Sequence, residues 1–399
     1  MMTMLADVLL FVGLLVLMPA VLLFVAEILS GLRAPIATPP GNAPAFTVLI
    51  PAHDEAGVIV PKLRSIAGQL RDGDRMLVIA DNCSDDTAAI AAVHGADATE
   101  RHDPVRRGKG YALAHGLAHA ARWGHAVTII VDADCLLSPG ALRHLAAAAA
   151  GSGRPVQGDY RLEAAPGGSR ASRFSAFAIR IKNYVRLLGG KRLGVPCVLT
   201  GSGMAFPTAL LSRVELGSGE IVEDLLLAVD LTLHGAAPRF CPEARITSPL
   251  PATREAAEAQ RARWEGGYLS IMRRYALRLA GTGLRRGDAR VLALALDLAI
   301  PPLSLLIAGQ GALLILTAFW ALLSGHAVPF AVAVVQMALM IGAIALAWHR
   351  YGRDLLSAGD LARLPLSVLA KLGFYRRILR APQRGWVRTE RGAEMKGRE

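Results

Sequence analysis

Three groups of acidic residues each follow an apolar run, and one of them contains a pair of carboxylates suited to a metal ion. Asp132 and Asp134 lie one residue apart, directly after the run from Val127 to Val131. Hard divalent cations such as Mg²⁺ or Mn²⁺ take oxygen ligands and often share them with substrate phosphates. A cation held there with a nucleotide diphosphate would act as a Lewis acid and neutralise a departing diphosphate. Turns are often rich in Asp, so this pair alone is not specific.

The other two acidic groups follow apolar runs nearer the N-terminus. Asp54 and Glu55 come after the run Phe46 to Ile50, and a second group begins at Asp81, after the run Met76 to Ala80. Continuous apolar runs that end in polar loops are typical of strands buried on both faces of a sheet. In open sheets, ligands bind beyond the carboxyl ends of the strands. The three acidic groups are therefore expected to converge on one crevice.

A basic segment, Arg106 to Gly110, precedes a helix that is predicted to begin near Tyr111. Its glycines permit close backbone approach, and a helix N-terminus favours an anion. Lys109 is therefore a candidate phosphate-binding residue, although an exposed basic turn explains the same pattern. The chain has no GxxxxGK[ST] segment and no GxGxxG after the first predicted strand, which argues against a P-loop kinase and a dinucleotide-dependent dehydrogenase.

Two further groups lie later in this region. Glu223 and Asp224 open a predicted helix, where they could act as N-terminal caps. Alternatively, one of these carboxylates takes the proton of an acceptor hydroxyl in a direct displacement. Gln260, Arg263 and Trp264 share one face of another predicted helix by their i, i+3, i+4 spacing. An indole beside a guanidinium and an amide suits a sugar or a diphosphate, whereas core packing of Trp264 is the alternative.

These motifs lie in residues 46–275, where short β-rich runs alternate with helical stretches. Further strands are predicted from Val156 to Tyr160 and from Val198 to Phe206. This alternation predicts an α/β domain with a mainly parallel sheet. Residues 32–45 contain the loop from Ala37 to Asn42, whose prolines and glycine indicate a linker.

The chain as a whole is unusually apolar. With 53% hydrophobic residues and a mean hydropathy of +0.38, it differs from ordinary soluble proteins. The run from Val8 to Ala26 carries no charge and could cross about 30 Å of hydrocarbon as a helix. Residues 1–31 are thus predicted to be a transmembrane anchor. A cleaved signal peptide is the alternative, but no Lys or Arg precedes the run.

Two more spans are predicted at residues 291–324 and 327–348. The first contains Asp297 and the pair Pro301-Pro302, so it could instead be a shorter span after an interfacial segment, and the total of three carries an uncertainty of one. The net charge is +12, and many basic residues lie in the tail, residues 349–399. By the positive-inside tendency this tail lies in the cytoplasm, and an even number of spans places the middle region there too.

The charge does not indicate nucleic-acid binding, because the basic residues flank the apolar runs and form no stripe with interleaved aromatics. The chain is predicted to be a multi-pass protein of the cell inner (cytoplasmic) membrane with a cytoplasmic catalytic domain.

The order of the motifs resembles that of the inverting family-2 glycosyltransferases. That group includes cellulose, chitin and hyaluronan synthases and many bacterial exopolysaccharide and glycolipid enzymes. The segments concerned are VLIPAHDE, the Asp81 group, RGKGYAL, DADC, LTGSGMAF, IVEDLLL and QRARW. The resemblance implies a GT-A fold, which is Rossmann-like with a mostly parallel sheet. It further implies transfer of a hexosyl or N-acetylhexosaminyl group from a nucleotide donor, with UDP as the expected nucleotide and Mg²⁺ or Mn²⁺ as the cofactor.

The resemblance also implies roles for the residues that match these motifs. Asp224 would be the general base, and Asp132 and Asp134 would hold the metal. The nucleotide sugar would be bound by Pro51, Ala52, Glu55, Asp81, Lys109, Asp132, Gln260, Arg263 and Trp264. The acceptor would contact Gly201, Ser202, Gly203 and Trp264. His53-Asp54 replaces the aromatic-Asn pair common in the family, which leaves the contact made by Asp54 open.

The membrane segments favour a saccharide or lipid-linked acceptor, together with membrane lipids and polysaccharide-assembly partners. The stretch from Leu364 to Ile378 resembles the amphipathic interfacial helix of these enzymes, and a surface helix packed on the catalytic domain is the alternative. Single-sugar transfer in exopolysaccharide or glycolipid biosynthesis is favoured, because about three spans make a poor export pore. The QRARW motif, in contrast, points toward a processive polysaccharide synthase.

Two alternatives belong to other classes of protein. One is a non-catalytic membrane subunit of an envelope-polysaccharide assembly, against which the intact acidic set argues. The other is a scaffold that binds anionic lipids, which leaves every carboxylate at a strand end unexplained.

Overall fold

The chain forms two compact units, and each is built from segments that are distant in sequence. The computed structural model describes residues 2–35, 39–217, 220–251 and 253–380. The sheet unit contains Pro35–Gly168 and Pro196–Ile271, and the helical unit contains Met1–Ala34, Ser169–Val195 and Met272–Pro382. The predicted catalytic domain, residues 46–275, is therefore interrupted by a segment that packs in the helical unit.

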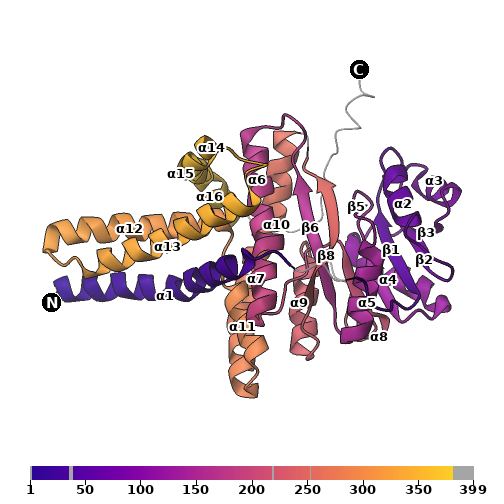
Figure 1. Ribbon diagram of the computed structural model, residues 1–399, viewed down its shortest axis with the longest axis horizontal. Coiled ribbons are helices and arrows are strands. Elements are labelled where there is room, and N and C mark those ends of the chain that lie inside the picture. Colours follow the sequence, from indigo (N-terminus) through magenta and orange to yellow (C-terminus); the bar gives the residue numbers. More distant parts are fainter. Residues whose placement is uncertain (1, 36–38, 218–219, 252, 381–399) are drawn as a thin grey trace. The chain divides into compact units, whose positions relative to one another are not determined.

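The sheet unit is built on one eight-stranded mixed sheet (Figure 1) with the strand order β3-β2-β1-β4-β7-β6-β8-β5. Strands β3, β2, β1 and β4 run parallel, as do β6 and β8, whereas β7 and β5 are antiparallel to their neighbours. The strands are β1 (Phe46–Ala52), β2 (Arg75–Asp81), β3 (Asp97–Arg101), β4 (Val127–Ile130), β5 (Leu136–Leu137), β6 (Val156–Glu163), β7 (Met204–Pro207) and β8 (Arg239–Pro249). The prediction of an α/β domain with a mainly parallel sheet is confirmed.

The parallel strands end at the same edge of the sheet. Ala52 of β1 lies opposite Ala80 of β2, and Leu49 lies opposite Ile130 of β4. Strands β1, β2 and β4 each lie between two other strands and are apolar and buried along most of their length, and the polar loops begin only where they end. The acidic groups that follow them therefore emerge side by side.

One predicted strand is largely wrong. Of the stretch from Val198 to Phe206, only the end lies in β7, and the preceding residues form a loop. Gly201 and Gly203 have φ angles of +94° and +68°, a left-handed backbone that strand geometry does not allow. The apolar content of the stretch reflects burial of a loop.

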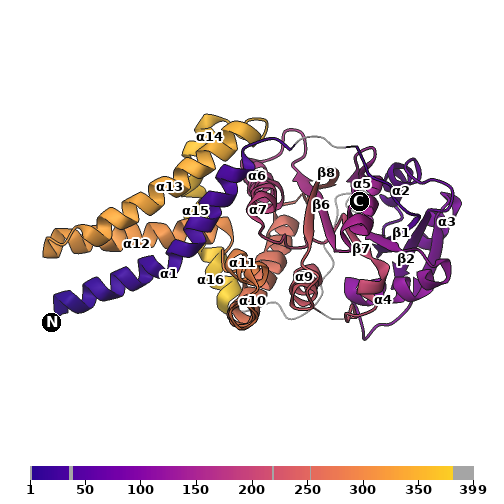
Figure 2. The same ribbon diagram turned by 60° about the horizontal axis from the view of Figure 1, so that its bottom comes forward.

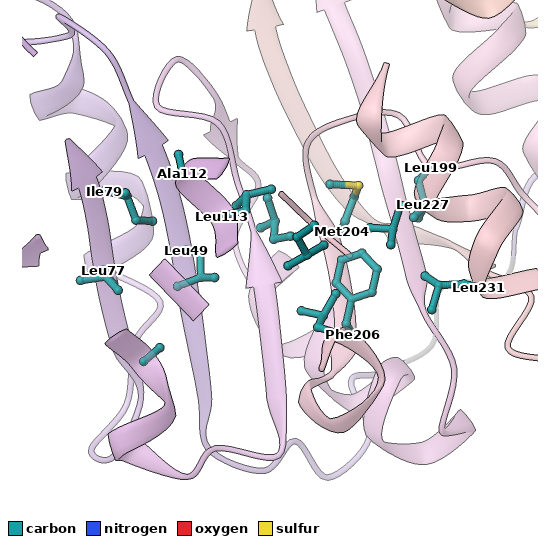
Figure 3. Close-up of a cluster of buried hydrophobic side chains, with 14 of the residues drawn as sticks. Leu49, Leu77, Ile79, Ala112, Leu113, Leu199, Met204, Phe206, Leu227 and Leu231 are labelled. Atoms are coloured by element: carbon teal, nitrogen blue, oxygen red, sulfur yellow. The ribbon is translucent and has the colours of Figure 1, made fainter. Parts of the chain in front are cut away.

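Two helices of the sheet unit pack on the same face of the sheet. They are α4 (Lys109–Ala120) and α9 (Glu223–Leu233), and Figure 3 shows their side chains meeting Met204 and Phe206 of β7 in a buried cluster. A Cβ on Gly116 of α4 would lie 2.6 Å from Cγ1 of Ile79, so the glycine lets α4 approach β2 closely. This packing fixes the N-terminal ends of both helices, where Lys109 and Glu223 lie.

The remaining helices of the sheet unit are mostly short. They are α2 (Ile59–Ala67), α3 (Thr87–Val93), α5 (Ala141–Ser152), α8 (Thr208–Leu211), a 3-10 turn (Ala121–Trp123) and the first part of α10 (Arg254–Arg286).

Among the described residues, the helical unit contains three helices that are long and apolar enough to cross a membrane, as predicted. They are α1 (Met2–Gly31), α12 (Leu303–Ser324) and α13 (Val328–Tyr351), which extend side by side in Figures 1 and 2. The segment predicted as one span from residue 291 is two helices, α11 (Ala289–Leu298) and α12. Pro301 and Pro302 separate them because proline lacks the amide hydrogen that a continuous helix needs.

The segment from Ser169 to Val195 packs on the first of these helices. It forms α6 (Arg170–Arg180), a π-helical turn (Ile181–Val185) and α7 (Arg186–Leu193). A Cβ on Gly189 of α7 would collide with the backbone carbonyl of Glu27, so the two helices touch backbone to backbone. The Arg186 guanidinium bridges Glu27 at 2.7 Å and Asp297 of α11 at 2.5 Å, which satisfies these charges away from water.

Three short helices follow the last span, namely α14 (Ala358–Ala362), α15 (Leu364–Ala370) and α16 (Leu372–Arg380). The stretch predicted as one interfacial helix, Leu364 to Ile378, is thus broken near Lys371. The Tyr375 hydroxyl lies 2.6 Å from Ser304 Oγ at the start of α12, so α16 is attached to the end of a span. The predicted tail beyond residue 380 and residues 36–38 of the predicted linker lie outside the described residues.

Candidate active site

The predicted carboxylate pair lies at the end of β4, held in place by two serines. The backbone amide of Asp132 donates to Ser202 Oγ at 3.0 Å, and Ser248 Oγ of β8 donates to Asp134 Oδ2 at 2.9 Å. Oxygen atoms of both carboxylates and the Cys135 sulfur lie within 4.8 Å of one another. Because two oxygen donors so placed match the ligand preference of Mg²⁺ and Mn²⁺, Asp132 and Asp134 could bind such an ion.

Lys109 joins three of the predicted motifs. Its Nζ atom lies 2.6 Å from Asp132 Oδ1 and 3.9 Å from Glu223 Oε1, and it donates to the carbonyl of Gly201 at 2.5 Å. Burial lowers the Lys109 pKa, but Asp132 and Glu223 outweigh burial and hold that pKa above its usual range. Lys109 therefore stays charged. The alternative interpretation, an exposed basic turn, does not account for these contacts of Lys109.

Glu223 and Asp224 open α9 beside this lysine. Burial raises the pKa of Glu223 to about 8, against the opposing charge of Lys109, and the neighbouring Asp224 raises it further. Asp224 Oδ2 lies 3.4 Å from the position that a Cβ on Gly201 would occupy. Asp224 therefore faces the loop of Gly201, Ser202 and Gly203, and a side chain at position 201 would crowd its carboxylate.

The residues after β1 and β2 form a second part of the site. Asp81 Oδ1 accepts from Arg101 Nη1 at 2.6 Å, and the Arg101 guanidinium lies 5.6 Å from the centroid of the Tyr111 ring. His53 Nδ1 lies 2.7 Å from the carbonyl oxygen of Asp81. The Arg101 guanidinium thus orients the Asp81 carboxylate. The sequence did not indicate Arg101, because this residue lies in a polar strand that no apolar run marks.

The loop after Ala52 is shaped by local hydrogen bonds. Asp54 has a φ of +51°, and its Oδ1 accepts from the Ser84 amide at 2.6 Å. The Glu55 amide donates to Thr87 Oγ1 at 2.8 Å. Asp tolerates the left-handed region because its short side chain bonds nearby backbone, so Asp54 ties the loop after β1 to the loop after β2. Pro51, Ala52 and Glu55 therefore lie beside the Asp81 group, as expected from the strand order.

The motif of Gln260, Arg263 and Trp264 lies on α10, and all three side chains are half-buried. Helical spacing places them on the same face as Gly267. A Cβ on Gly267 would lie 2.8 Å from Cγ1 of Val222, the residue before Glu223. This face of α10 therefore packs toward the start of α9. Direct contact unites Lys109, Asp132, Gly201 and Glu223, while the α10 motif is joined to them through this packing.

Comparison with known proteins identifies the family. A family model described as glycosyltransferase like family 2 matches residues 43–267, more than half of the chain. The chain belongs to this family. It is a glycosyltransferase of the GT-A type that uses nucleotide sugars, and the resemblance seen in its motifs is confirmed. No curated protein matches the chain.

A solved structure with a TM-score above 0.5 agrees with this fold. The mannosyltransferase PcManGT from Pyrobaculum calidifontis, in complex with GDP-Man and Mn2+, has a TM-score of 0.51 and 19% identity. The match covers 85% of this chain and 98% of that one. Glucosyl-3-phosphoglycerate synthase from Mycobacterium tuberculosis, with Mn2+, UDP and glucosyl-3-phosphoglycerate, has a TM-score of 0.35 and 22% identity, covering 53% of this chain and 77% of that one. The likeness to PcManGT extends well beyond the residues that the family model matches.

Proposed function

We propose that this glycosyltransferase moves one sugar, with inversion, from a UDP-sugar to a hydroxyl of a lipid-linked or saccharide acceptor at the cytoplasmic face of the membrane. The observation that carries the proposal is the position of Lys109. Its ammonium contacts a carboxylate of the metal-binding pair, a carbonyl of the acceptor loop and a carboxylate of the acidic pair on α9. The residues proposed to bind the donor and the acceptor therefore lie in one cluster with the start of the helix that carries the proposed base.

Asp224 is the proposed base. Its carboxylate faces Gly201, where the acceptor hydroxyl would enter, and it would take that proton as the acceptor oxygen attacks the anomeric carbon. The bond from that carbon to the diphosphate oxygen breaks in the same step, so the configuration inverts. Glu223 is the less suited residue of the pair at neutral pH, because burial raises its pKa to about 8 and favours its protonated form.

Asp132 and Asp134 are the proposed metal ligands. A divalent cation bound there would supply Lewis acidity toward the departing diphosphate. The structure of PcManGT contains Mn2+ with its nucleotide sugar, which supports a metal in the same role here. Lys109 holds Asp132 in orientation and would pair with the donor phosphates, to which a buried ammonium binds as a point charge.

The remaining residues bind the ends of the donor and the acceptor. Pro51, Ala52, Glu55 and Asp81 would contact the nucleoside, and Gln260, Arg263 and Trp264 would contact the diphosphate and the acceptor sugar. Because Arg101 already pairs with Oδ1 of Asp81, we expect Oδ2 of Asp81 to contact the nucleobase of the donor. The choice of UDP as the nucleotide rests on the resemblance of the motifs. Because PcManGT is in complex with GDP-Man, a GDP-sugar is the first competing donor to test.

The membrane acceptor is supported by the path of the chain. The acceptor loop begins a few residues after α7, which packs on α1, the first candidate span. The chain therefore connects the acceptor loop directly to the unit that holds the candidate spans. Three spans favour transfer of a single sugar over export of a polymer. A non-catalytic subunit is disfavoured because every acidic position of the site is retained.

The test is nucleotide release by the full chain in lipid nanodiscs. UDP-glucose, UDP-galactose, UDP-N-acetylglucosamine and GDP-mannose would be offered with and without Mn²⁺ and with extracted membrane lipids as acceptors. We expect metal-dependent release from one UDP-sugar, and one sugar per acceptor by mass spectrometry. Release from GDP-mannose alone would overturn the assignment of UDP as the donor nucleotide. Several sugars per acceptor would overturn the proposal of single transfer. No release from any donor would overturn the catalytic proposal.

A further inference from the structure

A cavity of about 330 Å³ lies in the sheet unit, at the amino ends of strands whose carboxyl ends carry the candidate active site. Thr47 and Thr128 line this cavity, and each is the second residue of its strand, β1 and β4. The two strands run parallel, and the acidic groups of the site follow their opposite ends. Of the described residues that line the cavity, none is proposed to bind the donor, the metal or the acceptor. The proposed function therefore gives no role to this cavity.

The floor of the cavity is a row of hydroxyl groups on the sheet. Thr47 lies beside Thr128 in the register of β1 and β4, and Thr208 follows β7, the strand on the other side of β4. Two residues further along the same strands, Leu49 and Ile130 belong to the buried apolar cluster that includes side chains of α4. Because side chains two residues apart in a strand share one face, this face of the sheet changes from aliphatic to hydroxyl side chains at the amino ends of β1 and β4.

These hydroxyl groups can form more hydrogen bonds than the protein alone supplies. Thr128 Oγ1 and Thr208 Oγ1 lie 2.9 Å apart, and Thr47 Oγ1 lies 2.8 Å from Nδ1 of His125. A hydroxyl offers one hydrogen and two lone pairs. When one threonine of the first pair donates to the other, the second keeps its own hydrogen, for which the described part of the chain contains no bonded acceptor. Thr47 and Thr128 are each only 2% exposed, so a further polar partner for them lies inside the cavity.

The walls of the cavity are mainly aliphatic. They are formed by side chains of α4, of α8 and of the segment after α8, namely Ala114, Leu117, Ala118, Leu211, Val214 and Leu216. None of the described residues that line the cavity is Lys, Arg, Asp or Glu. A charged ligand would therefore lose its hydration without gaining an ion pair, and a sugar would press several hydroxyl groups against aliphatic walls. The lining favours a neutral molecule that has an apolar body and one polar group.

We propose that this cavity, here called the threonine cavity, binds a neutral molecule of one or two rings that carries a hydroxyl or carbonyl group. The polar group would bond to the hydroxyls of Thr128 and Thr208, and the rings would contact the aliphatic walls. A cavity of about 150 Å³ is large enough for benzene, so the threonine cavity has room for two fused rings. Its volume also lies at the lower end of the range of known ligand sites, about 300–1,000 Å³.

The threonine cavity shares two elements with the candidate active site but lies at their other ends. Helix α4 begins with Lys109, whereas Leu117 and Ala118 near its end line the cavity. Strand β4 begins beside the cavity and leads to Asp132. A helix of twelve residues is about 18 Å long, so a molecule in the cavity and a nucleotide near Lys109 would not touch. The two ligands should therefore bind at the same time.

Hydrogen exchange followed by mass spectrometry tests whether the threonine cavity binds such a molecule. The full chain in lipid nanodiscs would be titrated with 2-naphthol, whose free concentration is set by dialysis to correct for uptake into lipid. We expect exchange in a peptide that covers residues 114–121 to slow at least threefold, with and without UDP and Mn²⁺. Naphthalene, which lacks the hydroxyl, and the charged 2-naphthoate should protect this peptide less. No protection by 2-naphthol up to its solubility limit, equal or stronger protection by either analogue, or loss of protection with UDP would overturn the proposal.

Two variants test whether 2-naphthol binds in the threonine cavity. Thr128→Val keeps the shape of the side chain but removes its hydroxyl, and should weaken 2-naphthol binding about 2–13-fold, the range of one neutral hydrogen bond. Ala118→Phe places a ring in the cavity from an exposed position and should abolish the protection. The matched controls are Thr232→Val, at a buried threonine of α9, and Ala92→Phe, at an exposed alanine of α3, and both should bind 2-naphthol within twofold of the wild type. Unchanged binding in either cavity variant, or an equal loss in its control, would overturn the assignment to this cavity.

Discussion

Replacing Lys109 by Met should have opposite effects on metal and nucleotide binding. The ammonium lies 2.6 Å from Asp132 Oδ1, so a divalent cation that binds Asp132 must compete with it. A unit charge pair at 4 Å is worth about 4 kcal/mol at an effective dielectric constant of about 20. The side chains of Lys109 and Asp132 are 19% and 28% exposed, and we halve the value for solvent screening. About 2 kcal/mol corresponds to about thirtyfold tighter binding of Mn²⁺ alone.

Nucleotide binding should change in the other direction. A hydrogen bond to a charged group contributes about 1.5–3 kcal/mol, so UDP should bind the metal-loaded Lys109→Met variant about 10–150-fold more weakly than the wild type. Free Mn²⁺ would be followed by electron paramagnetic resonance and UDP by calorimetry. Lys109→Arg, which keeps the charge, and Lys62→Met on α2 serve as controls. If Lys109→Met bound Mn²⁺ no more tightly, or bound UDP as well as the wild type, the assigned role of Lys109 would be refuted.

Three further predictions follow from the packing and charges of the site. Because burial raises the pKa of Glu223 from 4.5 to about 8, the folded chain keeps a proton that the unfolded chain releases. The wild type should therefore lose thermal stability relative to Glu223→Gln as the pH rises from about 4.5 to about 8, and a constant difference in Tm would contradict the shift. Ser248→Ala removes the hydrogen bond to Asp134 and should weaken Mn²⁺ binding about 10–100-fold in resonance titrations, with Ser248→Thr restoring it. Phe206→Ala should lower the free energy of unfolding by about 3–5 kcal/mol in denaturant titrations, whereas the exposed Val105→Ala should change it by less than about 0.5 kcal/mol.

The parts of the site that follow buried strands could be predicted from the sequence. The runs at β1, β2 and β4 are apolar because both faces of these strands are covered, and that pattern marks where each strand ends. Asp81 and Asp132 could therefore be placed at one edge of the sheet. Strand β3 was missed because its sequence, DATER, is polar and half-buried at the end of the sheet, which removes the apolar signal.

Contacts between distant segments could not be read from the sequence. Lys109 and Gly201 are 92 residues apart, and their contact depends on α4 and the loop before β7 meeting at one end of the sheet. Arg101 pairs with Asp81 only because β2 and β3 are neighbours. The packing of α7 against α1 was also missed, since arginines such as Arg186 made the segment look like part of a soluble domain. The ion pairs of Arg186 with Glu27 and Asp297 explain why it can be buried there.

The central claim is that Asp224 takes the proton of the acceptor in a metal-dependent sugar transfer, and Asp224→Asn tests it most directly. Asp230→Asn, on the same helix, is the matched control. Sugar transfer and binding of UDP with Mn²⁺ would be measured for both variants in nanodiscs with the donor found for the wild type. We expect Asp224→Asn to lose about 10²–10⁴-fold in kcat while UDP binds within about threefold of the wild type, and Asp230→Asn to retain transfer. Turnover by Asp224→Asn within tenfold of the wild type would contradict the account.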